Sequence, residues 1–220
     1  MNLQIIKTVS NQLSPGQLFI TGATRSESND QYFNSVFITA ITGIIDIYDK
    51  IILFPYSERS YSGLSAGRFL NAPEKFQRGR KQKIIDTTRG NIGITICFES
   101  IYPDFVRNLK VRNADFITNI ANDSWFGKTS EPYIHLYSNI ARAVELRIPV
   151  IRSTNNGISA IITQTGKISA STTLDTQEIL TGEVSKYKIS SIYAGYGDLI
   201  LILSALILLS GILLKNKTAI

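Results

Sequence analysis

The stretch NIGITICFES, residues 91–100, decides the fold of this chain. Ile92, Ile94 and Ile96 recur at every second position, which is the period of a β-strand with one apolar face. The residues after Cys97 favour a helix, so we expect the strand to end at the only cysteine of the chain. A thiol at such a junction lies near the N-terminal dipole of the helix, which favours the reactive thiolate. An inert core cysteine is the alternative, and this stretch alone leaves both interpretations open.

Other short, β-branched segments bounded by turn-forming residues predict further strands. They are residues 17–23, 32–41, 43–48, 114–121, 150–154 and 158–163. Helices are expected over 102–112 and over 131–147, the second capped by Ser130. An apolar stripe is expected along this second helix. Its members are Tyr133, Tyr137, Ile140, Ala141 and Val144. Strands interleaved with helices indicate a layered α/β protein.

Composition restricts the partners and the kinds of site. The 220 residues carry a formal net charge of +6, which favours phosphates, lipid headgroups or nucleic acid as partners. Residues 68–89 are rich in Lys and Arg and predict either a solvated loop or a contact with anionic lipid. Nucleic acid is not expected, because aromatic residues do not alternate with these charges. One cysteine and one histidine, His135, leave no set of ligands for a typical zinc site, and no metal or cofactor is expected.

An uncharged apolar run, LILILSALILLSGILL, covers residues 199–214. It is slightly shorter than the roughly 20 residues that span a bilayer, and lysines and tyrosines at its two ends suit the interfaces. A buried core helix is the alternative, but such a helix normally shows a polar face. We therefore expect a transmembrane helix here, with an orientation that the flanking charges leave open.

A second stretch, IIDIYDKIILFPYSE at residues 44–58, places Lys50 between two apolar runs. A lysine in such surroundings suits the stabilisation of a developing oxyanion. The two stretches together resemble the nitrilase, or carbon–nitrogen hydrolase, superfamily. That superfamily places a lysine before an "L-x-P-F/Y-x-E" turn, here ending at Glu58, and a cysteine in a "C-[YF]-E" elbow, here residues 97–99.

Further landmarks resemble one branch of the superfamily, the apolipoprotein N-acyltransferases, in the order of that family. They are FITGA (19–23), GLSAG (63–67), NDSWFG (122–127), ARAVE (141–145) and RSTNNG (152–157). The resemblance implies a nitrilase-like α-β-β-α layered domain, truncated at its N-terminus, over residues 1–192. A C-terminal transmembrane helix and short tail would occupy 193–220. It also implies a bacterial inner (cytoplasmic) membrane location, with the catalytic domain in the periplasm.

The chemistry implied by the resemblance is a two-step acyl transfer through a cysteine thioester, from a phospholipid donor to the N-terminal diacylglyceryl-cysteine of an apolipoprotein. Cys97 would be the nucleophile, and Lys50 with the backbone N–H of Phe98 would stabilise the oxyanion. Glu58 and Glu99 would support the site. Trp125 and Phe98 match positions near the substrate. His135 is given no catalytic role.

The chain departs from the superfamily in one respect. The superfamily uses a glutamate base from a strand upstream of the FITGA segment, and residues 1–16 contain no Asp or Glu. General acid–base catalysis contributes about 10²–10⁴-fold, so we expect no turnover by this chain alone. A fragment encoded upstream is then a further expected partner. Two alternatives stay open: an inactive fragment of a split gene, and an amidase of the same superfamily.

Overall fold

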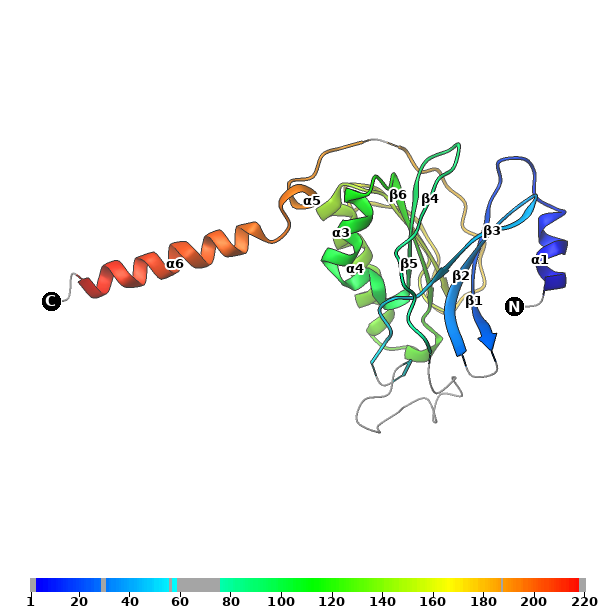
Figure 1. Ribbon diagram of the computed structural model, residues 1–220, viewed down its shortest axis with the longest axis horizontal. Helices are drawn as coiled ribbons and strands as arrows, with labels where there is room; N and C mark the ends of the chain where they lie inside the picture. The colour runs from blue at the N-terminus through cyan, green and yellow to red at the C-terminus, as the bar shows by residue number, and fades with distance from the viewer. Residues whose placement is uncertain (1–2, 29–30, 56, 59–75, 187, 218–220) are drawn as a thin grey trace.

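The computed structural model describes residues 3–28, 31–55, 57–58, 76–186 and 188–217 (Figure 1). Its strands form two sheets. Within the described residues, one sheet contains three antiparallel strands in sequential order: β1 (Phe19–Ser28), β2 (Gln31–Ala40) and β3 (Gly43–Asp49). Each is close to a strand expected from the sequence, and the predicted landmark at 63–67 lies outside the described residues.

The second sheet has six strands in sequential order among the described residues. They are β4 (Ile84–Ile85), β5 (Ile92–Ile96), β6 (Phe116–Asn122), β7 (Val150–Asn155), β8 (Ala160–Ile162) and β9 (Ile168–Ser171). The central strands β5, β6 and β7 are parallel, and the outer strands pair antiparallel. Helical connections join the parallel strands, as parallel pairing requires. The carboxyl ends of β5, β6 and β7 therefore meet at one edge of the sheet.

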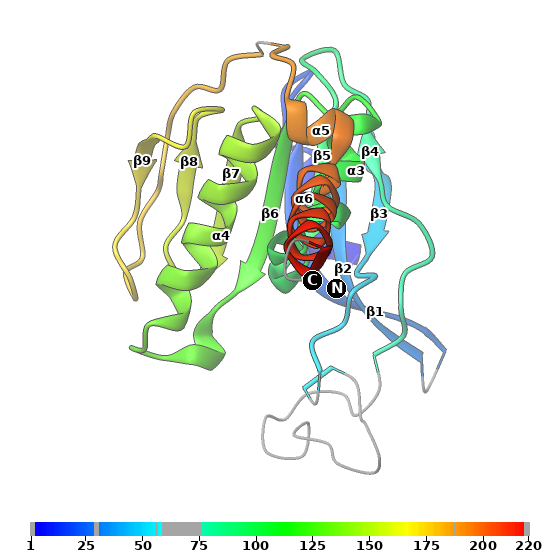
Figure 2. The same ribbon diagram turned by 90° about the vertical axis from the view of Figure 1, so that its left-hand side faces the viewer.

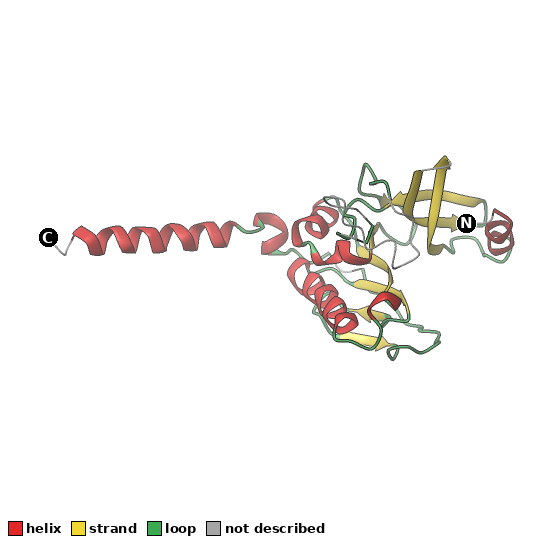
Figure 3. Cartoon of the chain, turned by 90° about the horizontal axis from the view of Figure 1, so that it is seen from below, coloured by secondary structure: helices red, strands yellow, loops and turns green. Residues whose placement is uncertain are grey.

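Two helices cover one face of the six-stranded sheet, and the three-stranded sheet covers the other (Figures 1 and 3). The helices are α3 (Pro103–Val111) and α4 (Glu131–Leu146). On the far side of the three-stranded sheet, α1 (Leu3–Ser10) packs against β2 and β3. This order of layers confirms the expected nitrilase-like α/β architecture.

Apolar side chains from both sheets fill the space between them. Val36, Ile38 and Tyr48 meet the isoleucines of β5, which lie on one face of that strand as the alternation predicted. Gly22 in β1 allows the close approach of the two sheets, because an added Cβ would lie 3.1 Å from the side chain of Ile120 in β6. The cysteine strand is thus enclosed by a core on both faces, which fixes where it ends.

The predicted apolar stripe of α4 was wrong for its tyrosines and Val144, whereas Ile140 packs against the core as predicted. Tyr133, Tyr137 and Val144 are exposed, whereas the face of α4 that packs into the protein contains His135, Leu136, Asn139, Arg142, Ala143 and Leu146. The buried face is partly polar because it adjoins the segment that follows Cys97, where backbone and side-chain groups need hydrogen-bond partners. The side chain of Ser130 also makes no capping hydrogen bond.

The C-terminal apolar run forms the helix α6 (Leu199–Lys217), preceded by the short helix α5 (Ile192–Tyr196), and it extends away from the layered body (Figures 1 and 2). Consecutive side chains from Leu199 to Leu203 are all exposed. The sequence predicted a transmembrane helix over 199–214. Within the part of the chain that the structure describes, however, no helix has both the length and the apolar character to cross a membrane.

The basic segment at 68–89 is described only from residue 76. Lys83 forms an ion pair with Asp46 at 2.5 Å, and Ile84 and Ile85 form the short strand β4. Gly79 packs on the end of β3, where an added Cβ would lie 1.9 Å from the carbonyl oxygen of Asp49. The described part of this segment therefore packs beside Lys50 through Gly79 and β4, while most of its basic side chains are exposed, as a solvated loop predicts.

Candidate active site

Cys97 stands at a strained turn between β5 and the 3-10 helix η1 (Cys97–Ile101). Its φ angle of 50° lies in the left-handed region, which a residue with a side chain adopts only where the surrounding structure enforces it. The carbonyl of Cys97 accepts hydrogen bonds from Asn119 at 3.2 Å and Ser100 at 3.1 Å. These contacts hold the elbow in place and leave the thiol half-buried between the sheets.

Lys50 follows the last residue of β3, and its ammonium forms an ion pair with Glu58 at 2.7 Å. Lys50 is 1% exposed and Glu58 is 8% exposed, so this is a buried pair. The remaining acceptor capacity of Glu58 is used by Asn34 and by the backbone N–H of Phe54, each at 2.7 Å. Glu58 therefore holds Lys50 and the turn that follows it in one arrangement.

Glu99 is fully buried within η1 and joins the two stretches that the sequence singled out. Its carboxylate accepts hydrogen bonds at 2.6–3.1 Å from the hydroxyl of Tyr48 and the backbone N–H groups of Ile51, Ile52 and Ile96. Burial raises the pKa of the Tyr48 phenol, and the charge of Glu99 raises it further, so Tyr48 remains a donor. Glu99 thus fixes the Lys50 turn relative to the Cys97 elbow.

The electrostatic surroundings of Cys97 differ from the sequence expectation. Burial raises the pKa of the Cys97 thiol, and the positive charge of Lys50 offsets only part of this effect. Asp123 and Glu58 raise the pKa further, while Arg152 lowers it. The segment after Cys97 is the short 3-10 helix η1, so the reactivity of the thiol stays a prediction. A proton acceptor is needed to ionise this thiol.

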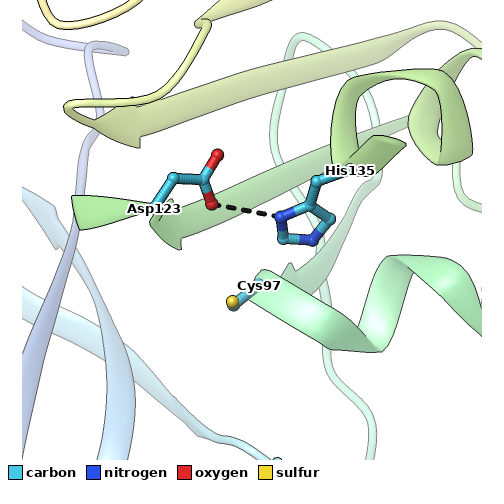
Figure 4. Close-up of side chains that lie close together, drawn as sticks. All are labelled: Cys97, Asp123 and His135. Carbon is cyan, nitrogen blue, oxygen red and sulfur yellow. Dashed lines mark hydrogen bonds and ion pairs between the residues drawn. The ribbon is translucent and has the colours of Figure 1, made fainter. Parts of the chain in front are cut away.

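A second polar cluster lies close to Cys97 (Figure 4). The Nδ1 atom of His135, from α4, is 3.1 Å from a carboxylate oxygen of Asp123, directly after β6. The other oxygen of Asp123 accepts a hydrogen bond from Arg152 of β7 at 2.5 Å, and both side chains of this ion pair are 0% exposed. Cys97 Sγ, a ring nitrogen of His135 and a carboxylate oxygen of Asp123 all lie within 4.8 Å of one another.

The parts of this cluster depend on one another. Arg152 also donates to Asn119 at 2.6 Å, and Asn119 in turn donates to the carbonyl of Cys97. Burial alone would raise the pKa of Asp123, but the hydrogen bond with His135 and the charge of Arg152 hold it below its usual value. Asp123 is therefore a carboxylate at neutral pH. Because it can only accept, the Nδ1 atom of His135 must carry the proton between them.

Thiol, imidazole and carboxylate are also the ligand types that zinc prefers. Both oxygens of Asp123 are already bonded to His135 and to Arg152. A cation here would also stand beside a buried guanidinium. The groups present are therefore a poor fit to a metal ion.

Comparisons with known proteins agree with this geometry. The model of the family described as carbon-nitrogen hydrolase matches residues 3–193. The chain belongs to this family. Among curated relatives, it is 36% identical to an apolipoprotein N-acyltransferase of Geobacter metallireducens over 174 residues, which are 76% of this chain and 33% of that protein. A relative of the same name from Allorhizobium ampelinum is 33% identical, with 81% of this chain and 36% of that protein aligned.

The chain thus spans about a third of the length of these curated relatives. Solved carbon–nitrogen hydrolase structures have the same fold. A carbon–nitrogen hydrolase of Helicobacter pylori G27 aligns with a TM-score of 0.66 and 16% identity, covering 83% of this chain and 66% of that one. An amidase of Nesterenkonia sp. AN1 aligns with a TM-score of 0.59 and 16% identity, covering 78% and 64%. These two likenesses concern the fold alone.

The structure brings Lys50, Glu58, Cys97 and Glu99 close together, and their catalytic roles stay predictions. The ring of Phe98 packs edge-on against Phe54, at 4.7 Å between ring centroids, and against Tyr102. Trp125 lies on the 3-10 helix η2 (Ser124–Phe126) and is 45% exposed. A substrate role for Phe98 and for Trp125 stays a prediction.

Sequence reasoning missed His135, Asp123 and Arg152 as neighbours of Cys97. Their signal lay in two of the family landmarks, NDSWFG and RSTNNG, which contain Asp123 and Arg152. Gly157 is the last residue of the RSTNNG landmark. An added Cβ at this position would lie 2.3 Å from a carboxylate oxygen of Asp123. The absence of a side chain at Gly157 thus leaves room for Asp123.

Proposed function

We propose that this chain carries the nucleophile of a phospholipid-dependent N-acyltransferase that acylates the N-terminal diacylglyceryl-cysteine of apolipoproteins. The observation that carries the proposal is the strained Cys97 elbow, tied through Glu99 to the buried Lys50–Glu58 pair. The similarity to relatives named apolipoprotein N-acyltransferase supports the choice of substrates. A phospholipid is the acyl donor and an apolipoprotein is the acceptor.

In the first step, Cys97 attacks the ester carbonyl of the phospholipid. The S–C bond forms, the ester C–O bond breaks, and a lysophospholipid leaves with a proton. Lys50 and the backbone N–H of Phe98 stabilise the negative oxygen of the tetrahedral intermediate. In the second step, the α-amine of the acceptor attacks the thioester, and the thiol of Cys97 is regenerated as the amide forms.

Glu58 and Glu99 act through other groups in this scheme. Glu58 orients the ammonium of Lys50, and Glu99 sets the distance between the Lys50 turn and the elbow. Trp125, being exposed beside the carboxyl end of β6, is proposed to contact the incoming acyl chain or acceptor.

The exposed apolar helix α6 supports a membrane location. Large apolar side chains exposed on every side of a helix are unfavourable in water, and lipid would remove this cost. We propose that α6 associates with the bacterial inner membrane that supplies the donor, and that residues 1–192 and 193–220 act as catalytic and membrane-associating parts.

The test uses membranes from cells that express the chain together with the upstream-encoded fragment expected to supply the glutamate base, and it supplies a phospholipid whose acyl chain carries an alkyne tag. Wild-type protein is expected to acquire a hydroxylamine-sensitive label at Cys97 and to transfer it to a peptide with an N-terminal diacylglyceryl-cysteine. Cys97→Ala should acquire none. Labelling that persists in Cys97→Ala would contradict the proposed nucleophile.

An amidase is the second candidate, because an amide substrate would form the same kind of thioester at Cys97. Ammonia release from short amides, with no label from the phospholipid, would favour it. No turnover with either substrate unless an upstream-encoded fragment is co-expressed would favour a chain that depends on that fragment.

A further inference from the structure

The carbonyl oxygen of Cys97 accepts two hydrogen bonds that come from different parts of the fold. One comes from Nδ2 of Asn119 in β6, at 3.2 Å, and the other comes from the hydroxyl of Ser100 in η1, at 3.1 Å. A backbone carbonyl oxygen has two lone pairs, so this acceptor is fully used. The plane of the peptide that joins Cys97 to Phe98 is therefore fixed by side chains from two elements.

Asn119 belongs to a row of polar side chains across the middle of the parallel sheet. It is in register with Thr95 of β5 and with Arg152 of β7, and it is 0% exposed. Burying an amide beside a guanidinium costs free energy unless the polar atoms have partners, and apolar side chains would fill the same place without that cost. Stability alone therefore gives no reason for this row.

The side-chain amide of Asn119 is fully engaged. Arg152 donates to its Oδ1 at 2.6 Å, while its Nδ2 donates to the hydroxyl of Thr95 at 3.0 Å and to the carbonyl of Cys97. Because a guanidinium can only donate and a carbonyl can only accept, the amide has one possible orientation. Arg152 is itself held by Asp123 at 2.5 Å. The direction in which Asn119 donates is thus set by the fold.

The direction of the Cys97 carbonyl determines the direction of the N–H that follows it. No cis peptide bond occurs among the described residues, so the bond between Cys97 and Phe98 is trans. A trans peptide is planar, and its C=O and N–H point in opposite directions. Since the carbonyl is directed at Asn119 in β6, the N–H of Phe98 points away from β6. Turning this N–H would break both hydrogen bonds to the carbonyl.

We propose that Asn119 is a positioning residue for the oxyanion donor of this site. Through the carbonyl of Cys97, it holds the N–H of Phe98 in the orientation that receives the negative oxygen, and Arg152 fixes Asn119 from behind. The inference rests on the proposed function in one respect, namely that Cys97 attacks an acyl carbonyl. Such a donor is effective because it is oriented before the charge develops. The φ angle of 50° at Cys97 needs enforcement by its surroundings, which these hydrogen bonds supply.

The test compares two reactions of the same thiol. Acylation by p-nitrophenyl acetate passes through a tetrahedral intermediate with a negative oxygen: the S–C bond forms, the ester C–O bond breaks, p-nitrophenolate leaves, and the thiol proton passes to solvent. Alkylation by iodoacetamide displaces iodide and develops no such oxygen. Access to the thiol and its ionisation affect both rates. The ratio of the acylation rate to the alkylation rate therefore reports the oxyanion donor.

Cys97 is the only cysteine of the chain, so both adducts are measured by mass spectrometry on one peptide. The full chain is used in the same membranes as in the phospholipid test, and Cys97→Ala is the blank for acylation of other side chains. N-acetylcysteine gives the ratio for a thiol without an oxyanion donor, and we expect a higher ratio for wild-type protein. Equal ratios would overturn this inference together with the proposed oxyanion site.

Asn119→Asp is the informative variant, because it keeps an acceptor for Arg152 but places an oxygen where Nδ2 donated to Cys97. We expect the ratio to fall about 10–100-fold, since a displacement of about 1 Å can cost that much in rate. Asn91→Asp is the matched control. Asn91 also donates to a backbone carbonyl, that of Asn113 at 3.1 Å, but it precedes β5, whereas Cys97 follows it. A wild-type ratio in Asn119→Asp would overturn the inference.

Ser100→Ala provides a second measurement that does not depend on how Asn119→Asp folds. It removes the other hydrogen bond to the carbonyl of Cys97 and introduces no charge, so we expect the ratio to fall about 2–10-fold, as for one neutral hydrogen bond. An unchanged ratio in Ser100→Ala would also overturn the inference. Ratios that fall in both variants, with no label from the phospholipid, would support the inference and contradict only the proposed acyl donor.

Discussion

Two groups of side chains lie near Cys97: the first side consists of Lys50, Glu58 and Glu99, and the second side consists of His135, Asp123 and Arg152. On the first side, every oxygen of both carboxylates accepts at least one hydrogen bond, and Lys50 has a buried partner. On the second side, Asp123 is equally engaged, but Nε2 of His135 has no partner among the described residues.

The difference bears on how firmly each set of groups is held. A closed set of hydrogen bonds holds its groups in one arrangement, which suits the fixed positive charge that an oxyanion requires. The second side leaves one buried ring nitrogen of His135 without a hydrogen-bond partner among the described residues. The two sides also differ in burial, since the Asp123–Arg152 pair is 0% exposed whereas Glu58 in the other pair retains a 10% exposed side chain.

The largest effect on stability is expected from Asp123→Asn. The substitution leaves the guanidinium of Arg152 buried without its charge partner, which typically costs about 3–5 kcal/mol. The measurement is the free energy of unfolding by urea at pH 7. A cost below that of Lys50→Met would contradict the view that the second side is the more strongly coupled one.

The same variant should change the pH dependence of stability. Because the folded pKa of Asp123 is depressed, the unfolded chain binds more protons below the ordinary value of 3.8. In wild-type protein, the ionised carboxylate of Asp123 therefore adds to the free energy of unfolding above that pH. This stabilisation is lost as the pH falls through the folded pKa of Asp123. When the free energy of unfolding is measured at successively lower pH, it should decline less in Asp123→Asn than in wild-type protein.

Lys50→Met tests the first side. It keeps the length of the side chain but leaves Glu58 without its cation, and we expect a cost of about 3 kcal/mol, at the lower end for buried pairs. The partial exposure of Glu58 gives its charge some access to water. Acyl labelling of Cys97 should also be lost. If Lys50→Met is destabilised but Cys97 is still labelled, Lys50 does not stabilise the oxyanion.

Gly157→Ala tests how tightly the second side is packed. The new Cβ would lie 2.3 Å from a carboxylate oxygen of Asp123 and 2.8 Å from its Cβ and Cγ, so the Asp123 side chain must move. We expect a cost of about 1–3 kcal/mol, as for other overpacked sites. Gly195→Ala, where an added Cβ meets no atom within 4 Å, is the matched control.

The first side could be predicted from the sequence because its signal is local. Lys50 and Glu58 stand in one turn, and Cys97 and Glu99 in one elbow, so two short stretches identified the residues. The second side is made from a helix and the ends of two strands, and no short stretch contains it. Its helix was also assigned the wrong buried face, because apolar residues were expected inside.

The error has a physical cause. The segment after Cys97 presents Ser100 and the carbonyl of Ile101 to α4, and Asn139 and Arg142 satisfy them. Burying Tyr133 and Tyr137 there would have left these groups without partners. The layered fold, in contrast, followed from the strand periodicity and from helical segments between strands, which do not depend on which face of a helix is buried.

The smallest effect is expected from Tyr137→Ser, which tests this reversed face. Tyr137 is 62% exposed, so removing its ring should change the free energy of unfolding by less than about 0.5 kcal/mol. The adjacent Leu136 is 5% exposed and packs in the core between α4 and the sheet, so Leu136→Ala should cost about 2–5 kcal/mol. The two residues are neighbours in sequence, and their side chains point in different directions. The ratio of the two changes in the free energy of unfolding therefore reports which face of α4 is buried. A large cost for Tyr137→Ser with a small one for Leu136→Ala would restore the stripe expected from the sequence. It would also remove His135 from the neighbourhood of Cys97, because His135 shares the face of Leu136 and Asn139.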